Sequence, residues 1–473
     1  MFEPPTFGSP KKSAIPLLAL VEFWERFNKY ALRAFLVIYL IAPTVKDGGY
    51  GLGWAIGDAI PLYSFFIACA YITPLGGGFI SDNVLGAYKS TLLGCILIAI
   101  GQLVISMPHD WLPNHESTVL FFGLFFFTLG NGLFKPNIAT LVGSVSKFYS
   151  LAPIKSYNLF FMITNFGGVV SGIALGSIVV WFDGNYQVGF FIAALGMLLG
   201  LLILLAYKSL LDVQLPSHNC SHPRLDIALS DSDICDKKSI YESPSTLDKK
   251  RISFIIVMGL FSIFFWLGYE QMAGSINVVT QRYTDRHLFG YEIPTAWFQS
   301  LTPLFNMMLA PVFYILWNKL KLKNRHLDIP NKMMISLLSS TFAFVIMSFC
   351  TSFIYSSFAN QINMWWIVIV YFCFSVGEIL FAPTCLSAIN EYISEKYVGL
   401  VMGLWFLFYA IASLFAGALG HGVDPNSSID ISKGELLENF TRLFVLITLL
   451  SLMAAVCLFV SRKKIIKLLQ LEV

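Results

Sequence analysis

The stretch Val21-Glu22-Phe23-Trp24-Glu25-Arg26-Phe27-Asn28-Lys29-Tyr30 lies inside an apolar run that extends from about residue 14 to residue 42. Such a run can cross a bilayer, which requires about 20 residues. Its charged residues fall on one helical stripe roughly 100° wide, because a helix turns by about 100° per residue. A charge at the bilayer centre costs at least about 2.5–3.5 kcal/mol, so the stripe is predicted to face protein or water and not lipid. The stripe consists of Glu22, Glu25, Arg26, Lys29 and Arg33.

A purely structural interpretation of this stripe stays open. Glu22 and Arg26 are four residues apart, as are Glu25 and Lys29, so ion pairs along one helix could neutralise them. Ionisable residues inside a membrane are more often functional, however. Phe23, Trp24 and Phe27 lie off the stripe.

The composition is that of a polytopic all-α membrane protein. Of the 473 residues, 56% are hydrophobic and 12% are charged, whereas soluble proteins have about 25% charged residues. The formal net charge is +3, and no basic run suggests nucleic-acid binding. No signal peptide is expected at the start. The cysteines show no metal-ligand spacing, and the sequence has no phosphate loop or nucleophile arrangement, so neither a cofactor nor enzymatic activity is expected.

The hydrophobic pattern predicts twelve transmembrane helices, in two halves of six. Residues 1–208 would form the first bundle, residues 209–251 a polar linker and residues 252–473 the second bundle. With the N-terminus placed in the cytoplasm, most of the 31 basic residues fall on the cytoplasmic side. Both termini and the linker are therefore predicted to be cytoplasmic. The predicted helices cover residues 14–42, 55–80, 89–107, 118–143, 155–181, 187–207, 252–279, 295–318, 331–354, 364–391, 398–421 and 440–461.

Three further ionisable residues, Lys135, Glu270 and Glu378, lie deep in apolar runs. With the stripe they give the membrane interior as many acids as bases, which a low-dielectric cavity requires. The first half carries the excess of positive charge, and the second half carries only acids. A cavity between the halves would therefore suit a zwitterion. Nearby aromatic residues could line it or could be ordinary packing residues; they are Tyr30, Tyr71, Phe161, Trp266 and Trp405.

The segment Gly77-Gly78-Phe79-Ile80-Ser81-Asp82-Asn83-Val84-Leu85-Gly86-Ala87-Tyr88-Lys89 follows the second predicted helix. It resembles the loop motif between helices 2 and 3 of the major facilitator superfamily, whose two six-helix halves enclose a central cavity. Gly78 and Gly86 would permit close helix approach and a tight turn. Asp82 would cap or lock a neighbouring helix end. A plain glycine-rich turn is the alternative.

More specifically, the chain resembles the proton-dependent oligopeptide transporters of that superfamily. Their first-helix signature is Glu-x-x-Glu-Arg-Phe-x-Tyr-Tyr, and residues 22–30 match it except that Lys29 replaces the first tyrosine. The resemblance continues through Arg33 and through residues 135–137, 160–167, 265–271, 298–303, 377–383 and 403–406. It therefore spans both halves.

The resemblance implies roles for the charged residues. Glu22, Glu25, Arg26 and Lys135 would couple transport to protons. Arg33 and Lys135 would also bind the peptide carboxylate, and Glu378 the amino terminus. Pairs Arg33–Glu270 and Lys135–Glu378 would gate the cavity. The implied substrate-binding set comprises Tyr30, Arg33, Tyr71, Lys135, Asn165, Trp266, Glu270, Glu378 and Trp405.

Three departures affect the expected substrate range. Lys29 stands for tyrosine, Phe161 for tyrosine and Thr302 for asparagine. Lys29 could pair with Glu25 or reach the cavity and favour acidic peptides; a lysine reaching towards the membrane interface is the structural alternative. Many bacterial members also insert two helices between the halves, for which residues 209–251 have no room.

The predicted function is proton-coupled symport of di- and tripeptides by alternating access. The expected partners are the peptide, the proton and the lipid bilayer, with the chain as a monomer in the plasma membrane. A proton-coupled antiporter of drugs or small metabolites on the same fold is the alternative, and a receptor without transport activity is a third class.

Overall fold

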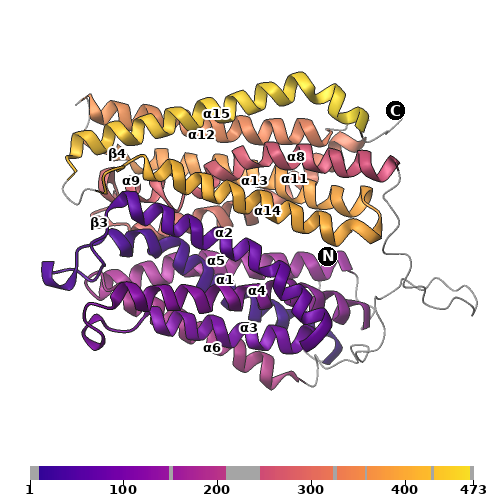
Figure 1. Cartoon of the computed structure of the whole chain (residues 1–473), viewed down its shortest axis with the longest axis horizontal. Coiled ribbons are helices and arrows are strands. Elements are labelled where there is room, and N and C mark those ends of the chain that lie inside the picture. The colour runs from indigo at the N-terminus through magenta and orange to yellow at the C-terminus, as the bar shows by residue number, and fades with distance from the viewer. Residues whose placement is uncertain are drawn as a thin grey trace, which may run out of the picture.

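The computed structural model describes residues 10–148, 153–208, 246–322, 328–356, 360–427 and 431–468. Long helices run side by side through most of this part of the chain (Figure 1). The first half contains α1 (Pro10–Ile41), α2 (Ile56–Ile80), α3 (Ala87–Ile105), α4 (Glu116–Phe148), α5 (Pro153–Trp181) and α6 (Tyr186–Ala206). The second half contains α8 (Thr246–Glu270), α9 (Ser275–Tyr283), α10 (Thr295–Gln299), α11 (Leu301–Leu322), α12 (Ile329–Tyr355), α13 (Met364–Tyr392), α14 (Glu395–His421) and α15 (Lys433–Leu468).

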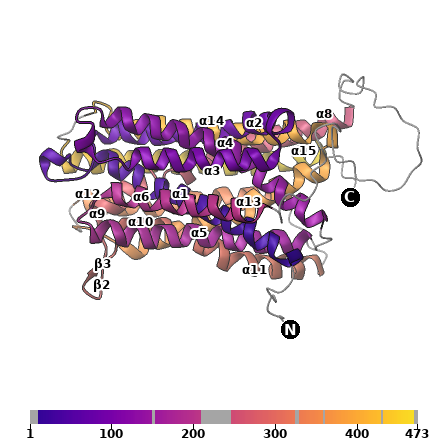
Figure 2. The ribbon, with the colours of Figure 1, turned by 90° about the horizontal axis from the view of Figure 1, so that it is seen from below.

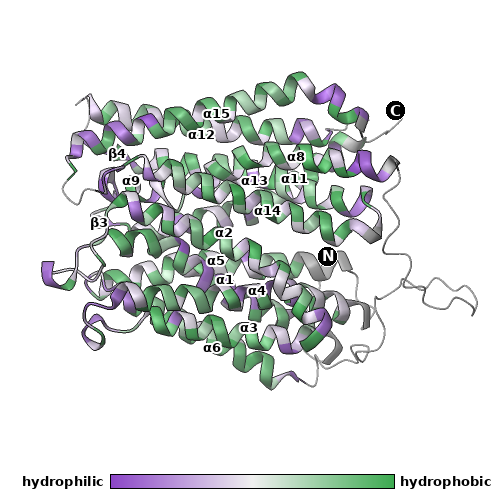
Figure 3. Ribbon diagram, in the orientation of Figure 1, coloured by the Kyte–Doolittle hydropathy of each residue, from purple (hydrophilic) through white to green (hydrophobic). Residues whose placement is uncertain are grey.

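The fold is the predicted one, with twelve membrane-crossing segments in two halves. In the described part of the chain, 11 helical segments are long and apolar enough to cross a membrane. In that set α8 and α9 count as one segment, as do α10 and α11. Helix α1 is the twelfth, and its charged stripe explains why composition alone does not identify it. Hydrophobic residues predominate along the helices (Figure 3), and many large apolar side chains are exposed.

The predicted linker lies almost entirely outside the described residues. Helix α8 begins at Thr246, so the last six residues of the predicted linker, 246–251, belong to it. The predicted boundary differs from the observed one because residues 246–251 are polar and yet form the first turns of α8. The start of α1, the end of α6, the start of α8 and the end of α15 lie at one end of the bundle, here called the terminal end (Figures 1 and 2).

Two predicted continuous helices are each broken. The run 252–279 is interrupted between Glu270 and Ser275, where Gly274 adopts φ −92° and ψ −110°. The run 295–318 is interrupted at Ser300, between α10 and α11. Hydropathy averaged over a membrane span does not detect such breaks, because each interruption is short and the span as a whole stays apolar.

Short elements lie in the connections. These are the 3₁₀ turns η1 (Val45–Asp47) and η3 (His109–Trp111), and the π-helical turn η2 (Ser81–Leu85). Strand β1 (Thr284–Asp285) pairs in parallel with β4 (Ile362–Asn363). Strand β2 (His287–Leu288) pairs with β3 (Tyr291–Glu292) in an antiparallel hairpin. The strands lie at the end opposite the terminal end, here called the loop end (Figure 2).

The two halves meet closely near the loop end. Asn277 Nδ2 on α9 donates to the carbonyl of Ala34 on α1, at 3.1 Å. His421 Nδ1 at the end of α14 bonds the carbonyl of Gly57 on α2, at 2.8 Å. Ser300 Oγ donates to the carbonyl of Val169 on α5, at 2.8 Å. The described halves are thus joined by hydrogen bonds on the loop side of the charged stripe.

The glycine prediction at the end of α2 needs a correction. A Cβ added to Gly77 would lie 2.0 Å from the carbonyl oxygen of Gly132 on α4, so Gly77 is the close-approach position. Gly78, the predicted one, has open space where its Cβ would stand. Adjacent glycines point about 100° apart, and the sequence does not reveal which of them faces α4. Gly86 does form the predicted turn, with φ +77°.

Candidate functional site

The charged stripe of α1 brings the four predicted proton-coupling residues together. Arg26 Nε lies 3.4 Å from Glu22 Oε1 and 3.7 Å from Glu25 Oε2. Lys135 Nζ, which α4 supplies, lies 4.0 Å from Glu25 Oε1. Both glutamates are buried, whereas the side chains of Arg26 and Lys135 are 28% and 26% exposed. One buried acid pair therefore shares two more accessible cations.

These carboxylates are held by charge and not by hydrogen bonds. Both oxygens of Glu25 and Oε2 of Glu22 have no hydrogen-bond partner among the described residues. A buried polar atom without a partner is costly, so the cluster is not optimised for stability. A proton on one of these oxygens would remove a buried negative charge and release a cation.

Arg33 and Glu270 join the two halves, as the family resemblance implies. Arg33 Nη1 lies 3.5 Å from Glu270 Oε1, and both side chains are buried. Arg33 Nη2 also donates to the carbonyl of Tyr269, at 3.3 Å. That carbonyl belongs to the last turn of α8, where it also accepts a turn hydrogen bond from the backbone N–H of Met272, at 3.2 Å. The guanidinium therefore binds both the acid and the end of the broken helix.

Two tyrosines complete this pair, and the sequence analysis missed both. Tyr63 Oη donates to Glu270 Oε2 at 3.1 Å, and Tyr409 Oη donates to Oε1 at 2.5 Å. Tyr63 comes from α2 and Tyr409 from α14. Tyr63 and Tyr71 are eight residues apart and thus share a face of α2, which could have pointed to Tyr63. Tyr409 gave no comparable signal.

Lys29 does not form the predicted pair with Glu25. Its Nζ donates to Tyr71 Oη at 3.4 Å and lies 5.1 Å from the centre of that ring. Tyr71 in turn stacks on Tyr409, with 3.8 Å between ring centres. The half-buried Lys29 therefore extends from α1 towards α2 and the second half. The prediction of an ion pair between Glu25 and Lys29 along one helix is therefore wrong, whereas the predicted pair of Glu22 with Arg26 is present.

Glu378 stands apart from the cations in this structure. Its Oε2 accepts from Asn306 Nδ2 at 3.0 Å, a partner that the sequence analysis did not identify. Among the described residues no ion pair joins Lys135 to Glu378, and Lys135 contacts Glu25 instead. The predicted second gating pair is therefore not formed here.

The predicted aromatic wall is mainly packing. Trp405 is 4% exposed, with its ring centre 5.5 Å from that of Phe381. Trp266 is also buried, 4.3 Å from the ring of Tyr409, and its Nε1 lacks a hydrogen-bond partner among the described residues. Tyr30 is nearly buried and packs against Gly168, where a Cβ would lie 2.9 Å from Tyr30 Cε2.

The remaining residues singled out from the sequence differ in exposure. Asn165 Nδ2 donates to the carbonyl of Phe161 on its own helix, at 2.8 Å. Phe161 is 45% exposed, whereas Thr302 is buried. Asp82 is exposed in η2. Helix α3, which follows η2, has no side-chain N-cap, and the locking role of Asp82 stays a prediction.

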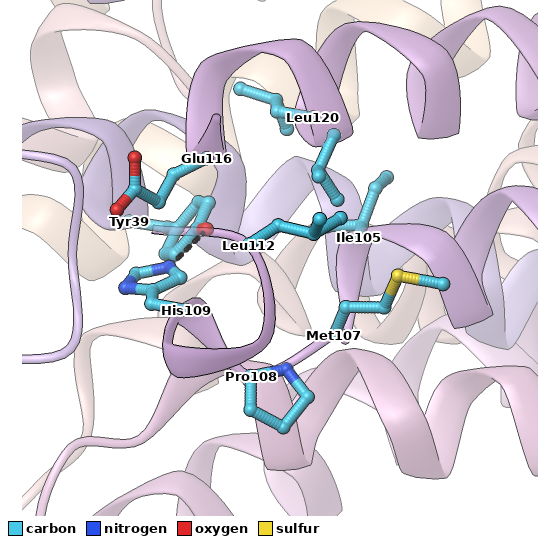
Figure 4. Close-up of a pocket in the computed structure, with 9 residues that line it drawn as sticks. Tyr39, Ile105, Met107, Pro108, His109, Leu112, Glu116 and Leu120 are labelled. Atoms are coloured by element: carbon cyan, nitrogen blue, oxygen red, sulfur yellow. Dashed lines mark hydrogen bonds between the residues drawn. The ribbon is translucent and has the colours of Figure 1, made fainter. Parts of the chain in front are cut away.

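Two hollows near the loop end are not lined by residues of the charged stripe. A cavity of about 10 Å³ lies beside Tyr39, His109 and Glu116 (Figure 4). It could hold one water at most. A wider hollow at the loop end is lined by Trp54, Asp58 and Ser427. Among the described residues, no group of three or more His, Cys, Asp or Glu side chains could hold a metal ion.

Comparison with known proteins agrees with this architecture. A family model described as the POT family matches residues 88–229 and 234–429. A peptide transporter of Yersinia enterocolitica is 29% identical over 462 residues, which cover 88% of each chain. The di-/tripeptide transporter of Lactococcus lactis is 26% identical, covering 98% of this chain and 97% of its own.

Solved structures match over nearly the full length. A mutant of a peptide transporter in complex with alafosfalin superimposes with a TM-score of 0.82 at 25% identity, covering 99% of this chain and 97% of that chain. A transporter in complex with 5-aminolevulinic acid gives a TM-score of 0.78 at 23% identity, covering 98% of each chain. The second likeness shows the fold alone.

Proposed function

Because the chain belongs to the POT family, the proton-dependent oligopeptide transporters, we propose that it imports di- and tripeptides together with protons. It is a multi-pass membrane transporter and not an enzyme. The observation that carries the proposal is the division of charge. An acid pair on α1 shares its cations Arg26 and Lys135, while Glu378 in the second half has no cation within 4.0 Å among the described residues.

Proton binding would prepare the carboxylate site. A proton on Glu22 or Glu25 would weaken the hold of that acid on Arg26 or Lys135, whose side chains keep some exposure. The carboxylate of a peptide could then replace the neutralised acid. This exchange keeps each partly buried cation paired, which avoids the cost of an isolated charge. Proton and peptide would therefore bind together.

Glu378 and Asn306 would receive the other end of the peptide. A carboxylate attracts an ammonium group, and the amide of Asn306 holds Glu378 Oε2 in place at 3.0 Å. The substrate would thus bridge a positive group in the first half and a negative group in the second. Binding would pull the halves together, as alternating access about a central site requires.

We assign the loop end to the outside of the cell, on the basis of the predicted cytoplasmic termini. The hydrogen bonds between the halves near the loop end then close the outer mouth, and Arg33–Glu270 is the charged part of that closure. The structure would correspond to a state that opens inward. We also propose the division 1–208, 209–251 and 252–473, location in the plasma membrane, and function as a monomer.

The proton gradient sets a bound on accumulation. A charge that moves through 100 mV gains about 2.3 kcal/mol. A proton-motive force near 150 mV would therefore supply about 3.5 kcal/mol per proton, enough for roughly a 300-fold gradient.

Uptake of labelled Ala-Ala into proteoliposomes with an imposed inward proton gradient tests the proposal. Uptake above that of gradient-free vesicles is expected. A proton-coupled antiporter of drugs or metabolites would instead show an outward flux that Ala-Ala does not inhibit. Absence of dipeptide uptake by protein that is folded in the vesicles would refute the symport proposal.

A further inference from the structure

Lys29 is a half-buried cation, and none of the described carboxylates neutralises its charge. Each of the other bases in the membrane interior, Arg26, Arg33 and Lys135, has a carboxylate oxygen within 4.0 Å. Lys29 has none among the described residues, and its Nζ donates to Tyr71 Oη. An ammonium group has three donors, so two of them are left for another acceptor.

The charge balance of the interior shows what that acceptor should be. With every group ionised, the acids Glu22, Glu25, Glu270 and Glu378 balance the bases Arg26, Lys29, Arg33 and Lys135. A bound proton raises the sum to +1. A zwitterionic peptide leaves it at +1, whereas a peptide with one acidic side chain returns it to zero. An uncompensated buried charge is expensive, so the anionic peptide is the better partner for the proton.

A tyrosine at position 29 would reverse this preference. The interior would then sum to −1 in the empty protein, and one proton with one zwitterionic peptide would make it neutral. With lysine instead of tyrosine at position 29, the peptide that makes the interior neutral therefore carries one more negative charge.

The position of Lys29 suits a second carboxylate. It lies one helical turn from Arg26 and one turn from Arg33 on the same stripe, so it stands beside the proposed carboxylate site and not within it. Its half-buried side chain reaches Tyr71, which stacks on Tyr409 of the second half. An acidic side chain could thus meet Lys29 while the peptide carboxylate meets Arg26 or Lys135.

We propose that Lys29, with the hydroxyl of Tyr71, is an anion subsite that selects peptides carrying one acidic side chain. This inference rests on the proposed peptide transport and names its substrate class. Charge-assisted hydrogen bonds are stronger than neutral ones, so the difference in specificity should be about tenfold or more.

Ala-Glu and Ala-Gln test the proposal, because they differ in charge and barely in shape. Their kcat/KM values are measured in proteoliposomes under one imposed pH gradient, for the wild type and for Lys29→Met, Lys29→Arg and Lys46→Met. Lys46 is an exposed loop residue and serves as the matched control. The wild type, Lys29→Arg and Lys46→Met should prefer Ala-Glu by about tenfold. Lys29→Met should lose that preference and still take up Ala-Gln.

The outcomes separate this inference from the proposed function. Equal rates for the two peptides in the wild type, or a preference that Lys29→Met retains, would overturn the acidic subsite while peptide transport stands. Equal loss of both peptides in Lys29→Met would also overturn it, since Lys29 would then act on transport in general. No uptake of any peptide by the wild type would instead reject the proposed function.

Discussion

Arg33 and Glu270 form an ion pair of 3.5 Å across the two halves, and the same guanidinium also bonds the carbonyl of Tyr269. We expect Arg33→Met or Glu270→Met to cost about 3–5 kcal/mol of stability, because each leaves an unpaired buried charge. The double variant should recover part of the loss. Thermal unfolding in detergent measures this. Arg442→Met, which removes an exposed pair with Glu438, is the control, with an expected change of at most about 1 kcal/mol.

Arg33→Met and Glu270→Met should also weaken the contacts that close the loop end. A cysteine introduced at Asp58, an exposed residue near the inter-half contacts of α2, should react faster with a membrane-impermeant maleimide in Glu270→Met than in the otherwise unchanged protein. Equal labelling rates would show that the hydrogen bonds near the loop end suffice for closure.

The acid pair on α1 is expected to carry the coupling proton. Glu22→Gln or Glu25→Gln should abolish uptake driven by a proton gradient, because an amide cannot exchange a proton. Counterflow exchange of labelled for unlabelled dipeptide should persist, since it requires no net proton movement. Glu438→Gln, on the exposed face of α15, should leave both assays unchanged. Full gradient-driven uptake in both stripe variants would contradict the assignment.

Two adjacent glycines near the end of α2, Gly77 and Gly78, should differ sharply in their tolerance of a methyl group. Gly77→Ala places a Cβ against the carbonyl of Gly132 and is expected to destabilise the protein by about 1–3 kcal/mol. Gly78→Ala meets open space and should be neutral or slightly stabilising, because alanine favours a helix. The unfolding temperatures of the two variants provide the comparison, and similar values would contradict the close approach.

His109 gives a pH dependence at the loop end. Burial lowers the pKa of this histidine below its ordinary value of about 6.5, and Glu116 and Asp110 oppose the shift. The unfolded chain therefore binds a proton more readily than the folded one. The resulting stability is present above about pH 6.5 and is lost as the pH falls through the folded pKa. The unfolding temperature of the wild type should thus fall more between pH 7 and pH 5 than that of His109→Gln, and parallel curves would disprove the effect.

Periodicity and charge energetics predicted the architecture because both are properties of single helices. The stripe on α1 and the pairing of Glu22 with Arg26 follow from the 100° rotation per residue. Partners on other helices were harder to predict. The carboxylates of Glu270 and Glu378 were identified from the sequence, but their partners Tyr63, Tyr409 and Asn306 were not. Tyrosine and asparagine are too common in such helices to be singled out.

The choice between competing partners was also beyond sequence reasoning. Lys29 could reach Glu25 on its own helix or Tyr71 on α2, and only the packing of α1 against α2 decides between them. Lys135 likewise contacts Glu25 here and not Glu378, which depends on how the halves are arranged.

The break between α8 and α9 separates one membrane-crossing segment into two parts that contact different halves of the protein. Helix α8 belongs to the second half, but α9 is bonded to the first half through Asn277 and the carbonyl of Ala34. If the halves rock against each other, either this bond breaks or residues 271–274 turn. In the second case α9 would move with the first half, and the four residues of the break would serve as a hinge at the loop end.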